Sequence, residues 1–275
     1  MGRLGILIAL LLSLVNYGVR FVRWEWFTRR LGYRIALLFN AHVYFAGLTM
    51  TATPGKAGEL VRSVFLKKEG MDYHNSIGLF LAERITDLIA VTVMASLVFL
   101  QFKYGLTVFA TTAFMLLLVC IIVHSPVMRR FVVENVFTDS SRKLDKTVHH
   151  IIDMLASTER LLDVPGYSGA LLFGLISWSA EAFAFWFLAS RLGYEVSLPL
   201  MMSIYSFAMM AGAVSFLPGG IGAAEVAMFF LLKNIGVADP DALSLTLVSR
   251  ITTLWFAVLI GLPSFLYLGI KKRDE

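Results

Sequence analysis

Apolar runs long enough to cross a lipid bilayer constrain this chain more than any other feature. A transmembrane helix needs about 20 mainly apolar residues, and runs of roughly this kind occur at 2–18, 76–102, 106–123, 167–190 and 242–268. Hydrophobic residues make up 58% of the 275-residue sequence, more than the about 45–50% of soluble domains. The sequence therefore predicts an all-α integral membrane protein, a polytopic helix bundle of about five to eight membrane elements.

Several functions are excluded or disfavoured by residue usage. The single cysteine, Cys120, lies inside an apolar run, which excludes an internal disulfide and a Cys-based metal site. The five histidines lack metal-ligand spacing, and no Ser-His-Asp arrangement, phosphate-binding loop or acid dyad stands out. We therefore expect no cofactor, no bound metal and no enzyme activity. The net charge of +5 comes from basic residues between the apolar runs, where they set membrane orientation rather than bind nucleic acid.

Basic residues also predict the orientation of the bundle. Most fall on one face, in segments 20–34, 56–68, 129–160 and 271–273, and the opposite face has only Arg3, Lys103, Arg191 and Lys233. Because cytoplasmic loops are enriched in Lys and Arg, we expect a multi-pass cell (plasma) membrane protein with an outer N-terminus and a cytoplasmic C-terminus. The first run has no cleavage site after it and predicts an uncleaved helix. The arginines of segment 20–34 are interpreted as interfacial, topology-setting charge.

Two proline-glycine breaks interrupt the apolar pattern, in TATPGKAGELVR (51–62) and in FLPGGIGAAEV (216–226). Proline lacks an N–H and disfavours helix at the preceding residue, and glycine permits backbone conformations that other residues resist. Short apolar stretches flank both breaks. Irregular backbone is tolerated at membrane depth only where protein or a water-filled cavity surrounds it. We therefore predict two broken or re-entrant helix pairs.

The two breaks belong to an internal repeat. Residue 218 follows residue 54 by 164 positions, and ERITDL at 83–88 is matched by SRITTL at 249–254. Three predicted spans separate the breaks, and an odd number of crossings inverts the second unit relative to the first. We expect one membrane domain (1–275), with repeat units at about 35–102 and 198–268 and an amphipathic segment at about 125–163 on the membrane surface or against the bundle. Inverted repeats with discontinuous helices are typical of secondary transporters.

Charged residues within the predicted spans mark a candidate substrate site. An arginine in a span needs a partner or water; Asp87 can neutralise Arg84 one turn away, whereas Arg250 needs a partner such as Glu225 or Glu181. Glu181 is interpreted as protonated by burial, as a proton-coupling site or as facing water. Half-helix N-termini at the breaks favour anions such as phosphate. The predicted substrate-binding residues are Pro54, Gly55, Lys56, Gly58, Glu59, Arg62, Glu83, Arg84, Asp87, Glu181, Pro218, Gly219, Gly220, Gly222, Glu225 and Arg250.

The order of these motifs resembles the lysylphosphatidylglycerol synthase transmembrane (flippase-type) family. The resemblance rests on NAHVYFAGLTMTATPGKAGELVRSVFLKKEG, LAERITDL, FLPGGIGAAEVAMFFLL and LVSRITTLWF, and it extends over nearly the whole chain. It implies lipid handling, since members fused to an aminoacyl-lipid synthase are associated with moving a modified phospholipid between leaflets, and others are linked to lipid-carried sugar pathways. The sequence resembles a stand-alone member without the synthase domain. Family members usually begin with an additional N-terminal span, and we expect this sequence to start near their second span.

We therefore predict a lipid transporter or flippase-like protein that moves or binds an anionic phospholipid or a polyprenyl-phosphate-linked head group. Its partners are membrane lipids and a lipid-modifying enzyme, and Lys56, Arg62, Arg84 and Arg250 screen the phosphate. The alternative is a membrane enzyme or accessory subunit in lipid-linked sugar or phospholipid modification, which needs an acid free of ion pairs. A third reading, a membrane scaffold, predicts no continuous polar cavity. The transporter hypothesis makes a geometric prediction: the two breaks meet inside the membrane.

Overall fold

The computed structural model describes residues 1–96, 105–127 and 142–271, and within these the chain forms helices and no β-strand. The long helices are α1 (Gly2–Arg30), α4 (Tyr73–Ser96), α5 (Gly105–His124), α7 (Arg142–Leu161) and α8 (Val164–Ser190). The shorter elements are α2 (Leu37–Leu48), the 3-10 turn η1 (Ala57–Leu60), α3 (Val61–Lys68), α9 (Leu198–Val214), α10 (Ala223–Asn234), α11 (Asp239–Arg250), a π-helical turn (Ile251–Trp255) and α12 (Phe256–Lys271). The predicted all-α membrane helix bundle is confirmed.

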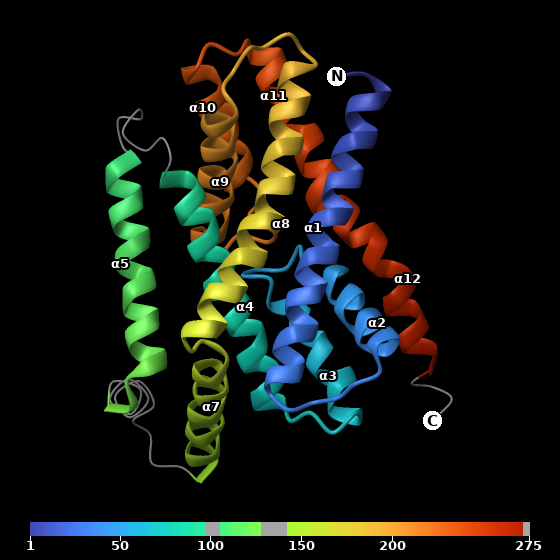
Figure 1. The fold of residues 1–275 in the computed structure, drawn as a ribbon, viewed down its shortest axis with the longest axis vertical. Coiled ribbons are helices and arrows are strands. Elements are labelled where there is room, and N and C mark those ends of the chain that lie inside the picture. Colours follow the sequence, from blue (N-terminus) through green and yellow to red (C-terminus); the bar gives the residue numbers. More distant parts are fainter. Residues whose placement is uncertain (97–104, 128–141, 272–275) are drawn as a thin grey trace.

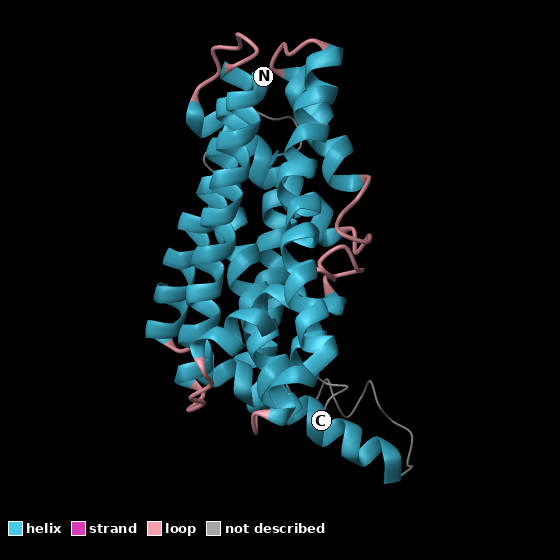
Figure 2. Ribbon diagram, turned by 90° about the vertical axis from the view of Figure 1, so that its right-hand side faces the viewer, coloured by secondary structure: helices cyan, strands magenta, loops and turns pink. Residues whose placement is uncertain are grey.

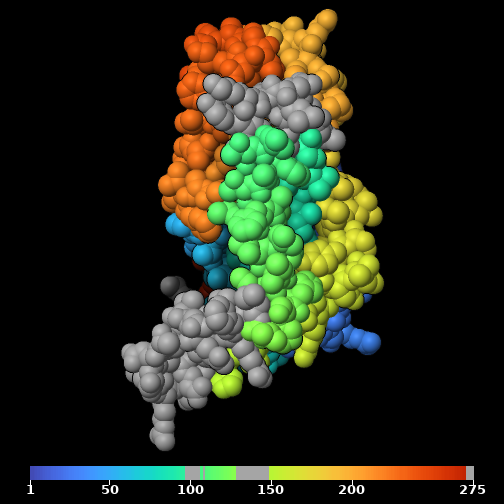
Figure 3. All heavy atoms as spheres, turned by 90° about the vertical axis from the view of Figure 1, so that its left-hand side faces the viewer, coloured from blue at the N-terminus to red at the C-terminus, as the bar shows by residue number. Residues whose placement is uncertain are grey.

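The helices run along one long axis, with the start of α1 and the end of α12 at opposite ends (Figure 1). Among the described residues, three helical segments are long and apolar enough to cross a membrane by length and composition: Gly2–Arg30, Val164–Ser190 and Asp239–Ile270. Helix α1 packs along α8, α2 along α12, and α4 along α9. Helix α5 lies on the outside of the bundle, over α4 (Figure 3).

Two clusters of buried apolar side chains hold the bundle together. One joins α4, α8, α9, α10 and α11 and includes Met94 and Phe185; the other joins α1, α2, α3, α4 and α7 and includes Trp24 and Leu79. Helix α4 belongs to both clusters, so it ties the two ends of the molecule to each other. Its charged residues fall within 83–87, where its buried apolar side chains pass from the second cluster, which includes Ile85, to the first, which includes Ala90.

Both proline-glycine breaks turn a short helix back toward the end of the bundle from which it came. Helix α2 has 12 residues and α3 has eight, and at a rise of about 1.5 Å per residue neither spans a hydrocarbon core of about 30 Å. In Figure 1, α2 and α3 lie in the lower half and α9 and α10 in the upper half. The connecting segments, which we call the first tip (49–56) and the second tip (215–222), meet at mid-height at one edge of the bundle (Figure 2).

Helix α1 is longer than the sequence predicted. The apolar run at 2–18 does not end in an interfacial segment, because the helix continues unbroken to Arg30. This places Arg20 and Arg23 inside the bundle, 5% and 0% exposed, whereas Arg34 is exposed. The topology-setting interpretation is therefore wrong for Arg20 and Arg23.

The last predicted span is also interrupted. Instead of one regular helix over 242–268, α11 ends at Arg250 and five π-helical residues precede α12. The hydroxyl of Tyr17 donates a hydrogen bond of 2.5 Å to the carbonyl of Thr253 within this turn. Single π turns inside α-helices occur frequently at functional sites.

The predicted amphipathic segment corresponds to α7, which packs against the bundle through α4 and α5. Leu155 and Ser157 are buried there, and the Thr158 hydroxyl donates to the carbonyl of Gly78 at 3.2 Å. The sequence left open whether this segment lies on the membrane surface or against the bundle, and in the structure it packs against the bundle. Phe102, Lys103, Arg129 and residues 272–273, which also carried predictions, lie outside the described residues.

Candidate functional site

The first and second tips meet as the sequence predicts. Pro54 and Pro218 form an isolated antiparallel bridge, and the Gly219 N–H donates a hydrogen bond of 3.4 Å to the Thr53 carbonyl. The tips thus join the two helix pairs through backbone contacts. Because backbone polar groups away from water need partners, this bridge satisfies part of an irregular backbone at mid-height.

Glycine is required where the tips fold most tightly. Gly219 and Gly220 have φ values of +60° and +68°, a region that other residues rarely adopt. A Cβ atom on Gly220 would lie 2.9 Å from the Cα of Gly212 in α9. On the first tip, Gly55 and Lys56 both have a φ of +57°. A left-handed lysine stores backbone strain, a feature that clusters at functional sites.

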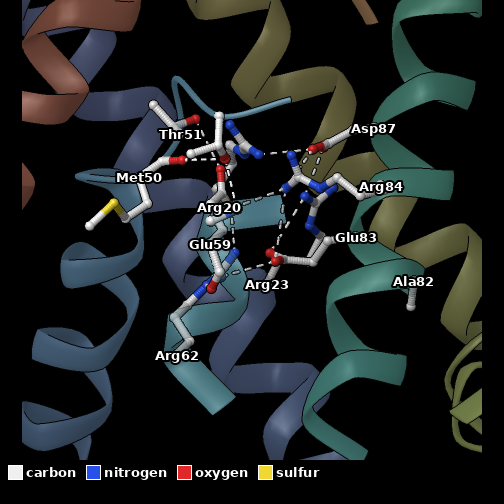
Figure 4. Close-up of polar contacts among 12 residues, drawn as sticks. Arg20, Arg23, Met50, Thr51, Glu59, Arg62, Ala82, Glu83, Arg84 and Asp87 are labelled. Carbon is white, nitrogen blue, oxygen red and sulfur yellow. Dashed lines mark hydrogen bonds and ion pairs between the residues drawn. The ribbon is translucent and has the colours of Figure 1, made fainter. Parts of the chain in front are cut away.

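A network of buried charges connects α1, α3 and α4 beside the first tip (Figure 4). Asp87 accepts hydrogen bonds from Arg20 at 2.9 Å and from Arg23 at 2.8 Å, and Arg84 lies 3.3 Å from it. The local pairing of Arg84 with Asp87 that the sequence predicts is therefore present. Four arginines face three carboxylates in this network, and the members are Arg20, Arg23, Arg62, Arg84, Glu59, Glu83 and Asp87. The network keeps one excess positive charge, and Lys56 adds another next to it.

Arg62 differs from its expected role. Its side chain is 2% exposed and pairs with Glu59 and with Glu83, the latter at 3.2 Å. Its guanidinium carbon lies 4.3 Å from the centre of the Trp24 ring, a cation–π contact. Because α3 runs from the first tip back toward the end of the bundle, the Arg62 side chain lies between α1 and α4 rather than at the tips. Its structural role is to lock η1 and α3 onto α4.

Arg250 binds the second tip directly. Its Nε donates to Glu225 at 2.6 Å and its Nη2 donates to the carbonyl of Gly219 at 2.5 Å. Of the two partners predicted for it, Glu225 is confirmed, and Glu181 forms no ion pair with Arg250 in the described part of the chain. Glu225 also accepts from the Gly222 N–H at 2.6 Å, so it caps α10 at the same time. One arginine therefore fixes the tip, the start of α10 and the end of α11 together.

A cavity of about 420 Å³ lies where the tips meet. Four cations line it, namely Arg20, Lys56, Arg84 and Arg250, whereas most other lining residues are apolar. It reaches the edge of the bundle, because its lining includes Phe216, which is 73% exposed. Of the predicted substrate residues, the structure brings to its wall Gly55, Lys56, Arg84, Asp87, Glu181, Gly219, Gly220 and Arg250. The others lie around it rather than on its wall: Pro54, Gly58, Glu59, Arg62, Glu83, Pro218, Gly222 and Glu225.

Glu181 of α8 differs from the other acids of the site. It is 6% exposed and lines the cavity, and Tyr205 of α9 donates a hydrogen bond of 2.7 Å to its carboxylate. The other four acids expected to be functional form ion pairs with arginines. In the described part of the chain, Glu181 has no such pair, and no group of three His, Cys, Asp or Glu side chains is placed to hold a metal ion.

Among the residues that sequence reasoning missed are Tyr17, Arg20, Trp178 and Tyr205 on the cavity wall and Arg23 in the charge network. A signal for the arginines was present. Ser13, Asn16, Arg20 and Arg23 recur at helical spacing and are all buried, which forms a polar stripe on an otherwise apolar helix. A polar stripe on a membrane helix faces the bundle interior, since lipid is a poor solvent for it.

Fold and site together define an integral membrane protein in which two helix pairs from opposite ends of the bundle meet at their tips, beside a cationic cavity at mid-height. The chain belongs to the lysylphosphatidylglycerol synthase TM region family, whose model matches residues 3–261. The resemblance seen in the motifs is thereby confirmed.

Individual relatives agree with this assignment. A UPF0104 membrane protein of Pyrococcus horikoshii is 26% identical over 93% of this chain and 84% of its own length. Another, from Methanothermobacter thermautotrophicus, is 25% identical over 93% of this chain and 81% of its own length. A phosphatidylglycerol lysyltransferase of Staphylococcus aureus is 30% identical over 33% of this chain, which corresponds to 11% of that protein.

Proposed function

We propose that this protein binds the phosphate-bearing head group of an anionic membrane lipid in the cavity and moves it between leaflets. The observation that carries the proposal is the composition of the cavity wall. Four cations stand at the meeting point of the tips, while most of the remaining wall is apolar. An amphiphile with an anionic head and apolar chains matches both parts, and phosphate is recognised well by arginine.

The lateral position of the cavity supports a membrane lipid over a water-soluble anion. Phe216 and Leu217 of the second tip line the cavity and are 73% and 44% exposed at the edge of the bundle. At mid-height of a membrane protein, such a rim faces acyl chains. A lipid can then keep its chains in the bilayer while its head group occupies the cavity. The similarity to phosphatidylglycerol lysyltransferase over part of the chain is consistent with lipid handling.

The proposal includes an inverted repeat of the two units, about 35–102 and 198–268. In this repeat, α2 is equivalent to α9, and α4 is equivalent to the segment formed by α11 and α12. The packing of α2 on α12 is therefore equivalent to the packing of α9 on α4. The pairing of Arg84 with Glu59 at 3.8 Å likewise corresponds to that of Arg250 with Glu225. Exposed basic residues such as Arg34 and Lys68 lie at the end that holds α3, so we place that end in the cytoplasm and the N-terminus outside.

The enzyme alternative receives less support from the site. General acid–base chemistry needs a titratable group within reach of the reacting atom, and four of the five candidate acids are held by arginines. Glu181 alone keeps this alternative open. The scaffold alternative predicts no continuous polar cavity between the tips. The cavity there is mostly apolar, but the four cations on its wall argue against a scaffold.

A vesicle assay tests the proposal. The purified protein is reconstituted into vesicles that contain a fluorescent phosphatidylglycerol, and movement of the label to the outer leaflet is followed with a membrane-impermeant quencher. We expect faster movement than in protein-free vesicles. Arg84→Gln and Arg250→Gln should slow it about tenfold or more, because each removes a charged hydrogen-bond donor, whereas Arg191→Gln, at an exposed arginine, should not. Equal rates in protein-containing and protein-free vesicles, or in all three variants, would refute the proposal.

A further inference from the structure

Glu181 is the one acid on the cavity wall without an arginine partner in the described part of the chain. Asp87, the other acid on the wall, has arginine nitrogens at 2.8 and 2.9 Å. The carboxylate of Glu181 has the Tyr205 hydroxyl at 2.7 Å and is 6% exposed. An ionised carboxylate kept from water without an ion pair is costly. The protonation of Glu181 therefore depends strongly on the other charges in the cavity.

The groups that face Glu181 come from every element around it. Tyr17 and Arg20 belong to α1, Lys56 to the first tip, Tyr205 to α9 and Arg250 to α11. On the α4 side, Asp87 accepts a hydrogen bond of 3.3 Å from Trp178, one turn before Glu181 on α8. Three cations therefore act on Glu181 across the cavity without touching it, and their fields favour the ionised carboxylate.

An anion in the cavity changes this balance. A phosphate beside Arg20, Lys56 and Arg250 neutralises the field that favours ionised Glu181, and it adds a negative charge that repels the carboxylate. Anion binding should therefore raise the affinity of Glu181 for a proton. By linkage, a proton on Glu181 raises the affinity of the cavity for the anion by the same factor.

We propose that Glu181 is a proton-binding site that couples proton uptake to head-group binding, so that one proton and one anionic lipid cross together. The inference rests on the proposed function. The proton comes from the aqueous phase and forms one O–H bond on the carboxyl group, and the reverse step returns it to the opposite aqueous phase. Tyr205 holds the carboxyl group in place through its hydroxyl. The pair that crosses carries less net charge than the anionic lipid alone.

The test uses vesicles containing the intact protein and fluorescent phosphatidylglycerol, with and without a gradient of one pH unit. For the unaltered protein we expect labelled lipid to accumulate in the leaflet on the alkaline side, with an asymmetry of up to about tenfold for one proton per lipid. A dye trapped inside should report proton entry that depends on the lipid. Glu181→Gln cannot bind the proton, so its ratio of leaflet populations should be the same with and without the gradient. Glu195→Gln, at an exposed glutamate, should behave as the unaltered protein.

Glu181→Asp keeps the carboxyl group and should keep the response to the gradient. It also shows whether a lost response in Glu181→Gln reflects the missing proton rather than misfolding. If Glu181→Gln moves lipid and responds to the gradient as the unaltered protein does, the coupling inference is overturned and the proposed function stands. If the unaltered protein moves no lipid under either condition, the proposed function is overturned, and the inference with it.

Discussion

Asp87→Asn provides the sharpest test of the buried charge network. Asp87 accepts from Arg20 at 2.9 Å and from Arg23 at 2.8 Å, and these side chains are 6% and 0% exposed. Asparagine has nearly the same shape and keeps one acceptor oxygen, but it removes the negative charge. The two arginines would then remain buried beside a neutral group. The remaining acid that pairs with Arg23 would be Glu83, at 3.7 Å.

The expected loss follows from burial rather than from the number of contacts. Removing one partner of a buried ion pair typically costs about 3–5 kcal/mol, because the other charge stays buried without compensation. An exposed ion pair contributes about 0–1 kcal/mol. Lys233 and Asp239 form a pair of similar length, 3.0 Å, with side chains 39% and 62% exposed. Asp239→Asn is therefore a matched control that changes the same functional group at the surface.

The measurement is the free energy of unfolding in mixed detergent micelles, obtained by titration with a denaturing detergent. We expect Asp87→Asn to lower it by about 3–5 kcal/mol and Asp239→Asn by less than about 1 kcal/mol. Similar values for the two variants would show that the network is not desolvated as its exposure implies, and the argument for an excess positive charge beside the first tip would fail with it.

Three further outcomes follow from individual residues. Gly220→Ala should destabilise the protein by about 1–3 kcal/mol and slow lipid movement, because the new Cβ atom would lie 2.9 Å from the backbone of α9. Gly236 also has a positive φ, +88°, but a Cβ atom there would have nothing within 4 Å. Gly236→Ala should therefore leave lipid movement in the vesicle assay unchanged. Arg250→Lys keeps the charge but loses the two-pronged geometry, so its lipid movement should fall nearly as far as that of the glutamine variant. The Gly166 N–H and the Arg30 guanidinium lower the pKa of Asp163 below its ordinary value of 3.8. The ionised carboxylate therefore stabilises the fold above about pH 4, and this contribution is lost as pH falls through the lowered pKa. In unfolding titrations, Asp163→Asn should be less stable than the unaltered protein at pH 7 and equally stable in strong acid.

The placement of helices and breaks could be read from the sequence because local rules determine it. Apolar runs of bilayer length predict the long helices. Proline followed by glycine interrupts the helical pattern at 54–55 and 218–219, whereas at 165–166 the same pair lies in the first turn of α8, where proline is tolerated. The meeting of Pro54 and Pro218 followed from one further inference, the repeat in register, which placed both tips at equivalent depths. These features depend on short stretches of chain, so a single sequence is sufficient to predict them.

The direction of charged side chains could not be read in the same way. By position in the sequence, Arg20 and Arg62 both look like loop or interface residues. In the structure, α1 continues past Arg20, and the guanidinium of Arg62 packs against the Trp24 ring. Their orientation depends on which helices pack together, which is a property of the tertiary structure. The π-helical turn after Arg250 is similar, because no residue in ITTLW marks it.

The two equivalent arginines, Arg84 and Arg250, differ in what their donors have left to bind. Arg250 has Nε on Glu225 and Nη2 on the carbonyl of Gly219, so its hydrogen-bonding capacity is largely used in holding the second tip. Arg84 has ion-pair neighbours at 3.3 Å or more, and its Nε and Nη2 make no hydrogen bond within the described part of the chain. Buried donors without acceptors are costly, and Arg84 lines the cavity, so its guanidinium keeps hydrogen-bonding capacity for a ligand there. Within the proposed function, Arg84 therefore contacts the head group, while Arg250 positions the tip against which the head group lies.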